Sequence, residues 1–284
     1  MNEKLRRDAD AIVAASIRAV QPDEAVRRAL EGREFPGRVR LVSVGKAAWQ
    51  MAKCAADLLG SRIEAGVVVT KYGHSKGPIA NFDIREAGHP VPDDNSFAGA
   101  QAAIDLVRGL TPQDTVLFLV SGGGSALFEK PLVSGGELAD ITRQLLACGA
   151  DIVEINTLRK RLSAVKGGKF ARLCAPARVY SIVLSDILGD PLDMIASGPA
   201  YPDSSTAADA KAIIAKYGLK LSDGALALME EETPKQLDNV TTQITGSVRQ
   251  LCAAAAQACQ SLGYEPVLLT HRLCCQAPEA GSFL

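Results

Sequence analysis

The chain has 284 residues, of which 47% are hydrophobic and 22% charged, so it can bury the core of one large domain or of two modest ones. Its 31 Lys and Arg residues nearly balance its 32 Asp and Glu residues, which excludes the basic excess typical of proteins that bind nucleic acid or an anionic membrane. No apolar run approaches the ~18 residues that span a bilayer. Met1–Leu30 is charged and amphipathic and lacks the apolar core of a signal peptide. We therefore expect a cytoplasmic protein.

The seven cysteines and three histidines make disulfide and zinc chemistry poor explanations of this sequence. The cysteine count is odd and no Cys-x-x-Cys occurs, which indicates reduced, mostly buried thiols. The adjacent pair Cys274-Cys275 is more typical of small core residues than of a redox centre. The histidines are scattered, so no metal-ligand spacing is present.

Short apolar runs alternate with segments of helical periodicity along the chain. The expected strands are Val39–Val44, Gly66–Thr70, Thr115–Val120, Val179–Leu184 and Pro266–Thr270. The expected helices are Lys46–Leu59, Ser96–Gly109, Gly136–Cys148, Ile155–Ala164, Ala207–Lys216 and Ser247–Leu262. Apolar strands without alternation, separated by helices, predict a parallel sheet covered on both faces. The predicted fold class is α/β, doubly wound and mainly parallel, with a Rossmann-like arrangement.

Two features predict how the chain divides into domains. The polar segment Glu230–Thr242 is the best candidate for a boundary. We expect a Rossmann-like domain over residues 1–235 and the incomplete beginning of a second α/β domain over residues 236–284. The last residues, Glu279–Leu284, begin a helix without a C-cap or a polar tail, so the sequence is expected to be cut short within an element.

The first chemically unusual segment follows the first expected strand, where ligands of an open parallel sheet bind. There Val44 is followed by Gly45 and Lys46 at the start of a helix. A cation in the first turn opposes the helix dipole, and a bound phosphate would reverse that penalty because the helix amides and the ammonium would share one anion. The alternative is a solvated lysine at a helix start.

The second segment follows the strand Thr115–Val120 and consists of Ser121, Gly122, Gly123, Gly124 and Ser125. Consecutive glycines let the backbone approach a ligand and present their amides as an anion-binding nest. The segment is not a P-loop, because no Gly-Lys-Ser/Thr follows, and Leu127 stands where the third glycine of a dinucleotide fingerprint would be. A flexible turn is the alternative, but the entropy cost of ordering three glycines favours a functional role.

The third segment follows the strand Val179–Leu184 and carries Asp186, Asp190 and Asp193 within eight residues. Mg²⁺ prefers carboxylate oxygen and is typically held by one or two carboxylates together with phosphate and water. The alternative is that these residues serve turns and caps, which the neighbouring Gly189 and Pro191 make plausible for Asp190.

Two weaker clusters complete the candidate site. In Asn156–Lys169 the charges are expected to form a solvated helix face. The pair Gly167-Gly168 beside Lys166 is the part expected to approach a ligand, with Lys166 as a phosphate or nucleotide contact. His89 lies in the Pro-rich loop Glu86–Asp93, where a structural role is the alternative to a place in the site.

These motifs, in this order, resemble the MOFRL family of glycerate 2-kinases. The motifs are Val-Gly-Lys-Ala-Ala, Glu-Ala-Gly-His-Pro-Val-Pro-Asp, Ser-Gly-Gly-Gly-Ser-Ala-Leu, Asn-Thr-Leu-Arg-Lys-Arg-Leu-Ser-Ala-Val-Lys-Gly-Gly and Ser-Asp-Ile…Gly-Asp…Ile-Ala-Ser-Gly-Pro, from Leu41 onward. The resemblance implies transfer of the γ-phosphoryl group of ATP to D-glycerate with Mg²⁺, giving 2-phospho-D-glycerate. It makes Lys46 the catalytic lysine. We also expect Asp186, which lies nearest the strand end, to contact the metal and to act in catalysis, and His89, Ser197 and Gly198 to contact the substrate.

The sequence departs from the family pattern at one point. Members of the family continue into a C-terminal domain with a Gly-Gly-Arg-Asn-Gln-Glu motif, whose arginine is thought to complete the active site, and this motif is absent. A chain that ends at Leu284 is therefore expected to bind phosphate or nucleotide weakly and to turn over no D-glycerate. Uncovered apolar surface around Pro266–Leu284 is expected to favour self-association.

Two other functions remain open at this point. A hydroxypyruvate reductase would need a nicotinamide site, and no Gly-x-Gly-x-x-Gly followed by an acidic residue is present. A non-catalytic regulator that binds a phosphosugar would keep the glycine nest but would have no need of Lys46 and the aspartates.

Overall fold

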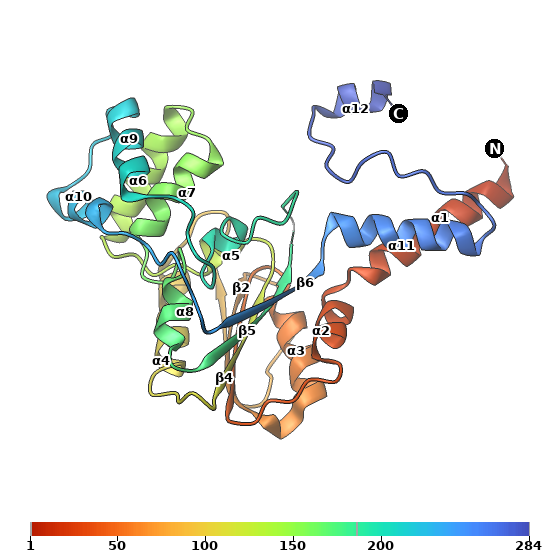
Figure 1. Cartoon of the computed structure of the whole chain (residues 1–284), viewed down its shortest axis with the longest axis horizontal. Helices are drawn as coiled ribbons and strands as arrows, with labels where there is room; N and C mark the ends of the chain where they lie inside the picture. Colours follow the sequence, from red (N-terminus) through yellow and green to blue (C-terminus); the bar gives the residue numbers. More distant parts are fainter. Residues whose placement is uncertain (1, 186, 284) are drawn as a thin grey trace.

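The structure is a computed structural model that describes residues 2–185 and 187–283. A sheet of six strands forms its centre (Figure 1). The strands are β1 (Val39–Val44), β2 (Ile63–Lys71), β3 (Phe82–Ala87), β4 (Thr115–Val120), β5 (Arg178–Leu184) and β6 (Val240–Gly246). The helices of eight residues or more are α1 (Glu3–Ala19), α2 (Pro22–Leu30), α3 (Ala48–Leu59), α4 (Asp94–Leu106), α6 (Gly135–Ala147), α7 (Ile152–Arg161), α9 (Ala207–Tyr217), α10 (Asp223–Glu230) and α11 (Val248–Ser261). The shorter helices are α5 (Gly124–Leu127), α8 (Lys169–Cys174), α12 (Ala277–Phe283) and the 3-10 turns η1 (Gly60–Arg62) and η2 (Ile195–Ser197).

The strand order alone predicts where a ligand crevice lies, without reference to any side chain. The order is β3-β2-β1-β4-β5-β6, and all neighbouring strands are parallel. The chain therefore winds outward in one direction from β1 and in the other direction from β4. In sheets of this order, ligands bind where the winding reverses, beyond the carboxyl ends of the two central strands. That point lies after Val44 and Val120.

Helices cover both faces of the sheet, as the sequence predicted. On one face α4 and α8 pack against the strands through residues such as Ala103 and Phe170. On the other face α2 and α3 pack through residues such as Val26 and Met51. Strand β4 is buried along its whole length, which explains its unbroken apolar sequence.

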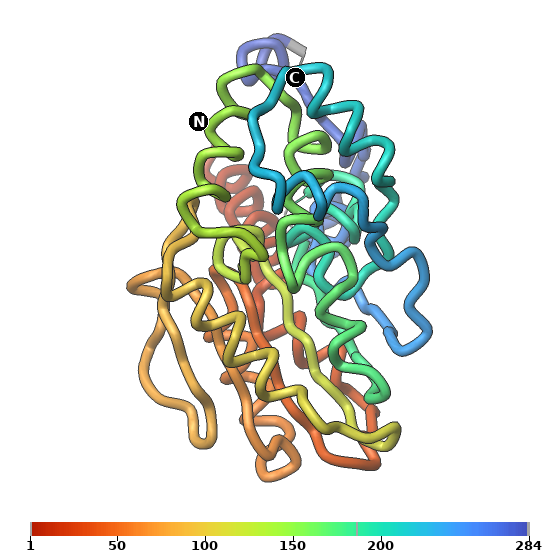
Figure 2. The backbone as a smooth tube through the Cα atoms, turned by 90° about the vertical axis from the view of Figure 1, so that its left-hand side faces the viewer, coloured from red at the N-terminus to blue at the C-terminus, as the bar shows by residue number. Residues whose placement is uncertain are grey.

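A separate group of helices stands at the carboxyl edge of the sheet (Figures 1 and 2). Helices α6, α7, α9 and α10 share a small core of their own that includes Leu145, Leu158 and Met229. In Figure 2 these helices, coloured green to blue, lie above the yellow helix α4 and the strands. The group therefore lies at the same edge of the sheet as the loops that follow Val44 and Val120.

Helices α1 and α11 form a projecting pair on the other side of the molecule (Figure 1). The Tyr264 hydroxyl, just beyond α11, donates a hydrogen bond to the Asp8 carboxylate in α1 at 2.6 Å. No residue of α11 is buried. Within the described residues no helix is long and apolar enough to cross a membrane.

The structure agrees with most of the predicted elements, but it forms no strand at Pro266–Thr270 and adds two strands, β3 and β6, that the sequence did not predict. The segment Pro266–Thr270 forms no strand, and its Val267 is 79% exposed, so the apolar run there does not pair with the sheet. Strand β6 begins within the polar segment Glu230–Thr242, which we expected to separate two domains, and it pairs with β5 along Val179–Leu184. The sheet therefore continues beyond the boundary expected after residue 235, because polar residues on an edge strand look like a linker in the sequence.

Candidate active site

The first candidate loop joins the ends of the two central strands. Lys46 donates its backbone N–H to the Gly122 carbonyl at 2.8 Å. Helix α3 begins only at Ala48, so Lys46 lies in the turn before the helix and not in its first turn. Its side chain is exposed. The ammonium is therefore free to face a ligand beyond the sheet edge.

Gly45 is required by the close approach of this loop to the next one. Its φ is +118°, and a Cβ atom would lie 2.3 Å from the Ser121 hydroxyl oxygen. That hydroxyl accepts a hydrogen bond from the Ala47 N–H at 3.1 Å and donates one to the Val44 carbonyl at 3.3 Å. Ser121 is 1% exposed. The Ser121 side chain therefore joins the two loops. It does not face a ligand, although the sequence predicted that Ser121 would contact phosphate.

The glycine-rich loop presents a row of backbone amides. Gly123 adopts a left-handed conformation with φ of +86°, and the short helix α5 starts at Gly124. In the described part of the chain the amides of Gly122, Gly123, Gly124 and Ser125 have no hydrogen-bond partner. Adjacent amides around a left-handed residue form a concave site for an anion. The loop therefore retains the geometry that its sequence predicted.

His89 and Lys46 come together over this loop. A Cβ atom on Gly123 would lie 3.0 Å from His89 Cδ2 and 3.2 Å from Lys46 Cε. The loop after β3 thus reaches across β2 and β1 to the glycine-rich loop. The imidazole, the ammonium and the row of amides occupy one small region, which supports the prediction that His89 belongs to the site.

Two residues that the sequence did not single out, His74 in the loop after β2 and Trp49 in α3, lie beside this region. His74 Nδ1 lies 2.9 Å from the Lys46 carbonyl oxygen. The indole N–H of Trp49, in the first turn of α3, donates to the Gly77 carbonyl at 2.7 Å. These two contacts hold the loop 72–81 against the turn that carries Lys46. Nothing in the local sequence indicated them, because they depend on the adjacency of β1 and β2.

A strained turn borders the site on its other side. Ala196, Ser197 and Gly198 have φ values of +53°, +61° and +66°. A left-handed conformation costs about 1–2 kcal/mol for a non-glycine residue. The N–H groups of Gly167 and Gly168 hold this turn by donating to the Ser197 and Gly198 carbonyls at 3.0 and 2.7 Å. Strain of this kind is concentrated at functional sites.

Ser197 and Gly198, which we predicted to contact substrate, lie beside the glycine-rich loop but inside the protein. The Ser197 hydroxyl lies 3.1 Å from the Ser125 hydroxyl and donates to Asn156 Oδ1 at 3.0 Å. Ser197 is 0% exposed. A Cβ atom on Gly198 would lie 2.8 Å from the Asp193 carbonyl oxygen. Both residues thus shape the wall of the site.

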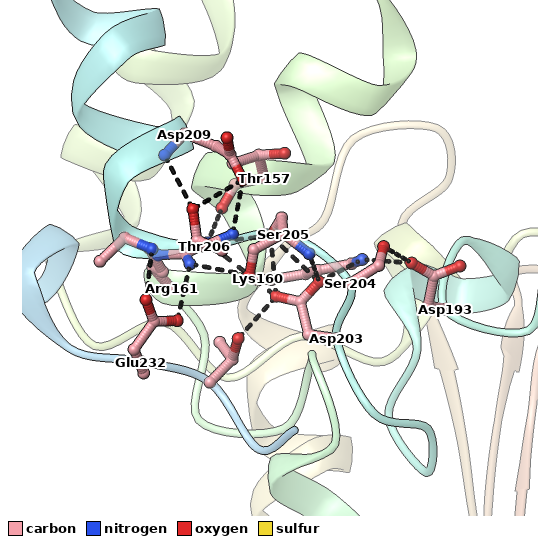
Figure 3. A network of polar contacts seen from close by, with 12 residues as sticks. Thr157, Lys160, Arg161, Asp193, Asp203, Ser204, Ser205, Thr206, Asp209 and Glu232 are labelled. Atoms are coloured by element: carbon pink, nitrogen blue, oxygen red, sulfur yellow. Dashed lines mark hydrogen bonds and ion pairs between the residues drawn. The ribbon is translucent and has the colours of Figure 1, made fainter. Parts of the chain in front are cut away.

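The acidic loop is only partly as predicted. Asp186 lies outside the described residues. Asp190 is half-buried, with φ of +53°, and its carboxylate has no partner in the described part of the chain. The Asp193 carboxylate accepts a hydrogen bond from Ser204 at 2.6 Å and lies 3.4 Å from the Lys160 ammonium (Figure 3). The described residues contain no group of three or more His, Cys, Asp or Glu side chains that would hold a metal. Asp193 as a metal ligand would have to share its charge with Lys160, which the sequence did not indicate.

Two basic residues of α7 are buried, whereas we expected a solvated face. Lys160 and Arg161 are 2% and 1% exposed. The Lys160 ammonium donates to Asp203 Oδ1 at 2.9 Å (Figure 3). The Thr233 hydroxyl donates to Asp203 Oδ2 at 2.7 Å. Burial raises the pKa of Asp203, but hydrogen bonds from Lys160 and Thr233 outweigh it, and the net pKa is lowered. This network fixes α7 to the segment that follows the strained turn.

Lys166 does not line the surface of the glycine-rich loop. It is 0% exposed, and its ammonium donates to the Ser125 and Phe128 carbonyls at 2.8 and 2.9 Å. Burial lowers its pKa to about 8. The prediction that Lys166 contacts phosphate directly is therefore wrong. Its side chain is buried, and its ammonium contacts backbone carbonyls of the loop instead.

Comparisons with known proteins agree with this architecture. Residues 8–230 match a domain family described as "Domain of unknown function (DUF4147)". The chain is 51% identical to "D-glycerate 2-kinase" of Thermotoga maritima, over 99% of this chain and 68% of that protein. It is 38% identical to "Glycerate 2-kinase" of Pyrococcus horikoshii, over 96% and 66%, and 40% identical to a "Putative hydroxypyruvate reductase" of Agrobacterium vitis, over 98% and 63%.

A solved structure gives the same result. The crystal structure of glycerate kinase from Thermotoga maritima has a TM-score of 0.95 and 51% identity, and the match covers 99% of this chain and 68% of that one. The chain thus spans about two thirds of the length of the proteins that it matches. The similarity extends over nearly every element described above, including the three loops at the carboxyl edge of the sheet. The chain therefore belongs to the DUF4147 domain family and, with it, to the family of the glycerate 2-kinases.

Proposed function

We propose that this chain carries the phosphate-binding part of a kinase that transfers the γ-phosphoryl group of ATP to the 2-hydroxyl of D-glycerate. The observation that carries the proposal is the convergence of Lys46, His89 and the amides of the glycine-rich loop at the switch point of the sheet. Phosphoryl transfer depends mainly on positioning and on neutralising charge, and these groups supply both. The names of the relatives in Thermotoga maritima and Pyrococcus horikoshii support the same activity.

Each group has a distinct role in this proposal. The amides of residues 122–125 hold phosphate oxygens, and the Lys46 ammonium neutralises charge that develops on the transferred group. His89, beside Lys46, is placed to hydrogen-bond the acceptor. Ser197 and Gly198 hold the loop in shape from the side.

A magnesium ion bound with the nucleotide fits this edge of the sheet. Mg²⁺ usually keeps several waters and needs only one or two carboxylates in addition to phosphate. Asp190 provides one carboxylate without a partner among the described residues, and Asp193 a second that is shared with Lys160. The ion would neutralise phosphate charge there.

The seven free thiols fit a reducing compartment, and we propose that the reaction takes place in the cytoplasm.

The proposal is tested in two steps. First, isothermal titration of the purified 284-residue protein with MgATP should show binding that is lost in Lys46→Met. Second, a chimera that appends the remaining third of the Thermotoga maritima relative should consume ATP only with D-glycerate. Enolase distinguishes the product, because it acts on 2-phosphoglycerate and not on 3-phosphoglycerate. A chimera that is folded and binds MgATP but forms no phosphoglycerate would contradict the proposed reaction.

A reductase is the second candidate, because the crevice lies where sheets of this order bind dinucleotides. The name of the Agrobacterium vitis relative points the same way. Against it, the first loop carries Gly45-Lys46 in place of a glycine fingerprint. Oxidation of NADH or NADPH by the chimera in the presence of hydroxypyruvate would favour this alternative. A regulator without catalysis would bind a phosphosugar and show neither activity.

A further inference from the structure

A buried cluster of charged side chains lies directly beneath the glycine-rich loop. The Ser125 carbonyl accepts hydrogen bonds from the Lys166 ammonium at 2.8 Å and from Arg159 Nη2 at 2.9 Å. Glu129 Oε2 lies 3.3 Å from Arg159 Nη2 and 3.6 Å from Lys166 Nζ. Two cations from different segments thus hold one backbone carbonyl of the loop.

The charges of this cluster do not balance. Lys166 and Glu129 are 0% exposed and the Arg159 side chain is 13% exposed, so two cations share one carboxylate inside the protein. Glu129 Oε1 and Arg159 Nε are buried without a hydrogen-bond partner in the described part of the chain. In that part, Glu129 and Arg159 are the charged groups that face Lys166. A buried positive charge without a counterion is costly unless something compensates for it.

An anion on the amides of the glycine-rich loop would provide this compensation. The amides of residues 122–125 have no hydrogen-bond partner among the described residues, whereas the Ser125 carbonyl of the same segment accepts hydrogen bonds from both cations. Attraction through the protein interior is stronger than through water because the effective dielectric constant is lower. The loop would thus gain anion affinity from charges that never touch the ligand.

We propose that Lys166 and Arg159 are positioning residues for the anion site: they fix the Ser125 carbonyl so that the loop amides converge, and they supply the positive charge beneath the bound anion. The proposal rests on the proposed function only in that the loop binds a phosphate-like group. It requires no transfer of a phosphoryl group. Neither residue contacts the ligand.

This arrangement couples anion binding to a proton on Lys166. Burial lowers the pKa of Lys166 to about 8, so its charge is present below that pH and is lost above it. A bound anion favours the protonated ammonium and raises this pKa, so binding takes up a proton near pH 8. Anion affinity should therefore be highest below pH 8 and fall as the pH rises, by up to about tenfold per pH unit for one strictly linked proton.

Inorganic sulfate is a suitable probe, because its own charge does not change over this pH range. Titration of the purified protein with sulfate from pH 7 to 9.5 should show affinity that falls above pH 8. Lys166→Arg, which keeps a charge that does not titrate, should retain affinity at pH 9.5. Lys166→Met should bind more weakly at every pH and show no dependence on pH.

Lys169→Met is the matched control. Lys169 is also a partly buried lysine whose pKa is lowered to about 8 by burial, but its ammonium donates to the carbonyls of Lys160, Arg161 and Ser163 at the end of α7. Its removal should leave the pH dependence of sulfate binding unchanged. If Lys169→Met removes that dependence, or if Lys166→Arg keeps it, the proposal is wrong.

A measurement on the unaltered protein covers the case in which the Lys166 variants do not fold. The side-chain ¹³Cε resonance of Lys166, assigned by NMR, should titrate near pH 8 and shift to higher pH when sulfate is added. An unchanged titration in the presence of bound sulfate, or the absence of sulfate binding, would overturn the proposal. Failure of the kinase assay alone would overturn the proposed reaction and leave this result intact.

Discussion

The hydroxyl oxygens of Ser125 and Ser197 lie 3.1 Å apart, although 72 positions separate the two residues along the chain. This contact joins the glycine-rich loop to the strained turn 196–198. Next to it, a Cβ atom on Gly124 would lie 2.6 Å from Ala196 Cβ. The loop and the turn are therefore packed too closely for a side chain at position 124.

Replacing Gly124 with alanine should disturb both segments. Ala196 cannot move without disturbing the hydrogen bonds of Gly167 and Gly168 to the turn, so we expect Gly124→Ala to lower the free energy of unfolding by about 1–3 kcal/mol and to weaken sulfate binding. Urea unfolding and calorimetric titration measure the two effects. Gly136→Ala in α6 is the control, because the nearest atom to its Cβ would be 4.0 Å away. Equal stability of the two variants would refute the close packing.

Lys46→Met should reduce turnover without affecting the fold. Loss of one charge-stabilising group typically lowers kcat by at least ~10²-fold. The substitution is expected to do so in the chimera, with an unchanged circular dichroism spectrum, because the Lys46 side chain is exposed. Lys53→Met is the control, since Lys53 pairs with Asp57 on the surface. Near-normal kcat in a folded Lys46→Met protein would exclude the catalytic role.

Asp203→Asn should destabilise the protein strongly. The substitution removes the negative charge that Lys160 and Arg161 share in the interior (Figure 3). Removing one partner of a buried ion pair costs about 3–5 kcal/mol, whereas Asp57→Asn at an exposed pair should cost less than about 1 kcal/mol. Thermal unfolding with urea titration at pH 7 measures both variants. A small effect at Asp203 would mean that the cations find another partner.

The carboxylate of Asp203 should also make the free energy of unfolding depend on pH. The pKa of Asp203 is lowered in the folded protein, because hydrogen bonds from Lys160 and Thr233 outweigh the effect of burial. Its contribution is therefore complete above the unfolded pKa of about 3.9 and is lost as the pH falls through the folded value. The difference in unfolding free energy between the unaltered protein and Asp203→Asn should shrink as the pH is lowered from 5 to 2.

The two described aspartates of the acidic loop should behave differently. Asp190→Asn should raise the Mg²⁺ concentration needed for MgATP binding, because its carboxylate has no partner in the described part of the chain. Asp193→Asn should mainly lower thermal stability, because that carboxylate is held by Ser204 and Lys160. Titration of Mg²⁺ at constant ATP separates the two. Identical Mg²⁺ titrations for Asp190→Asn and the unaltered protein would assign Asp190 a structural role.

The sequence predicted the position of the site because that position follows from the sheet. Apolar strands that end in Gly45-Lys46 and in Ser121–Ser125 are recognisable locally, and parallel pairing brings their ends to one edge. His89 could be assigned to this edge only by resemblance. Its contact with Gly123 depends on how the loop after β3 crosses two strands, and this is not encoded in neighbouring residues.

The roles of the basic residues could not be predicted in the same way. A lysine in an amphipathic segment is usually exposed. Lys160 and Lys166 are nevertheless buried, because the Asp203 carboxylate and the Ser125 carbonyl, both distant in sequence, accept hydrogen bonds from their ammonium groups. The apolar run Pro266–Thr270 shows the opposite error. The sequence predicted a strand there, but the run pairs with no neighbouring strand, so its apolar residues are not buried in the sheet. In each case a contact made in three dimensions outweighed the local pattern.

The indole of Trp49 gives this site an optical reporter. It is the single tryptophan of the chain, it follows Lys46 by three residues, and its N–H bonds to the loop that carries His74. Any movement of that loop on ligand binding changes the polarity around the ring and hence its emission. Fluorescence excited in the tryptophan band therefore follows the turn around Lys46 without a label and without a background from other indoles.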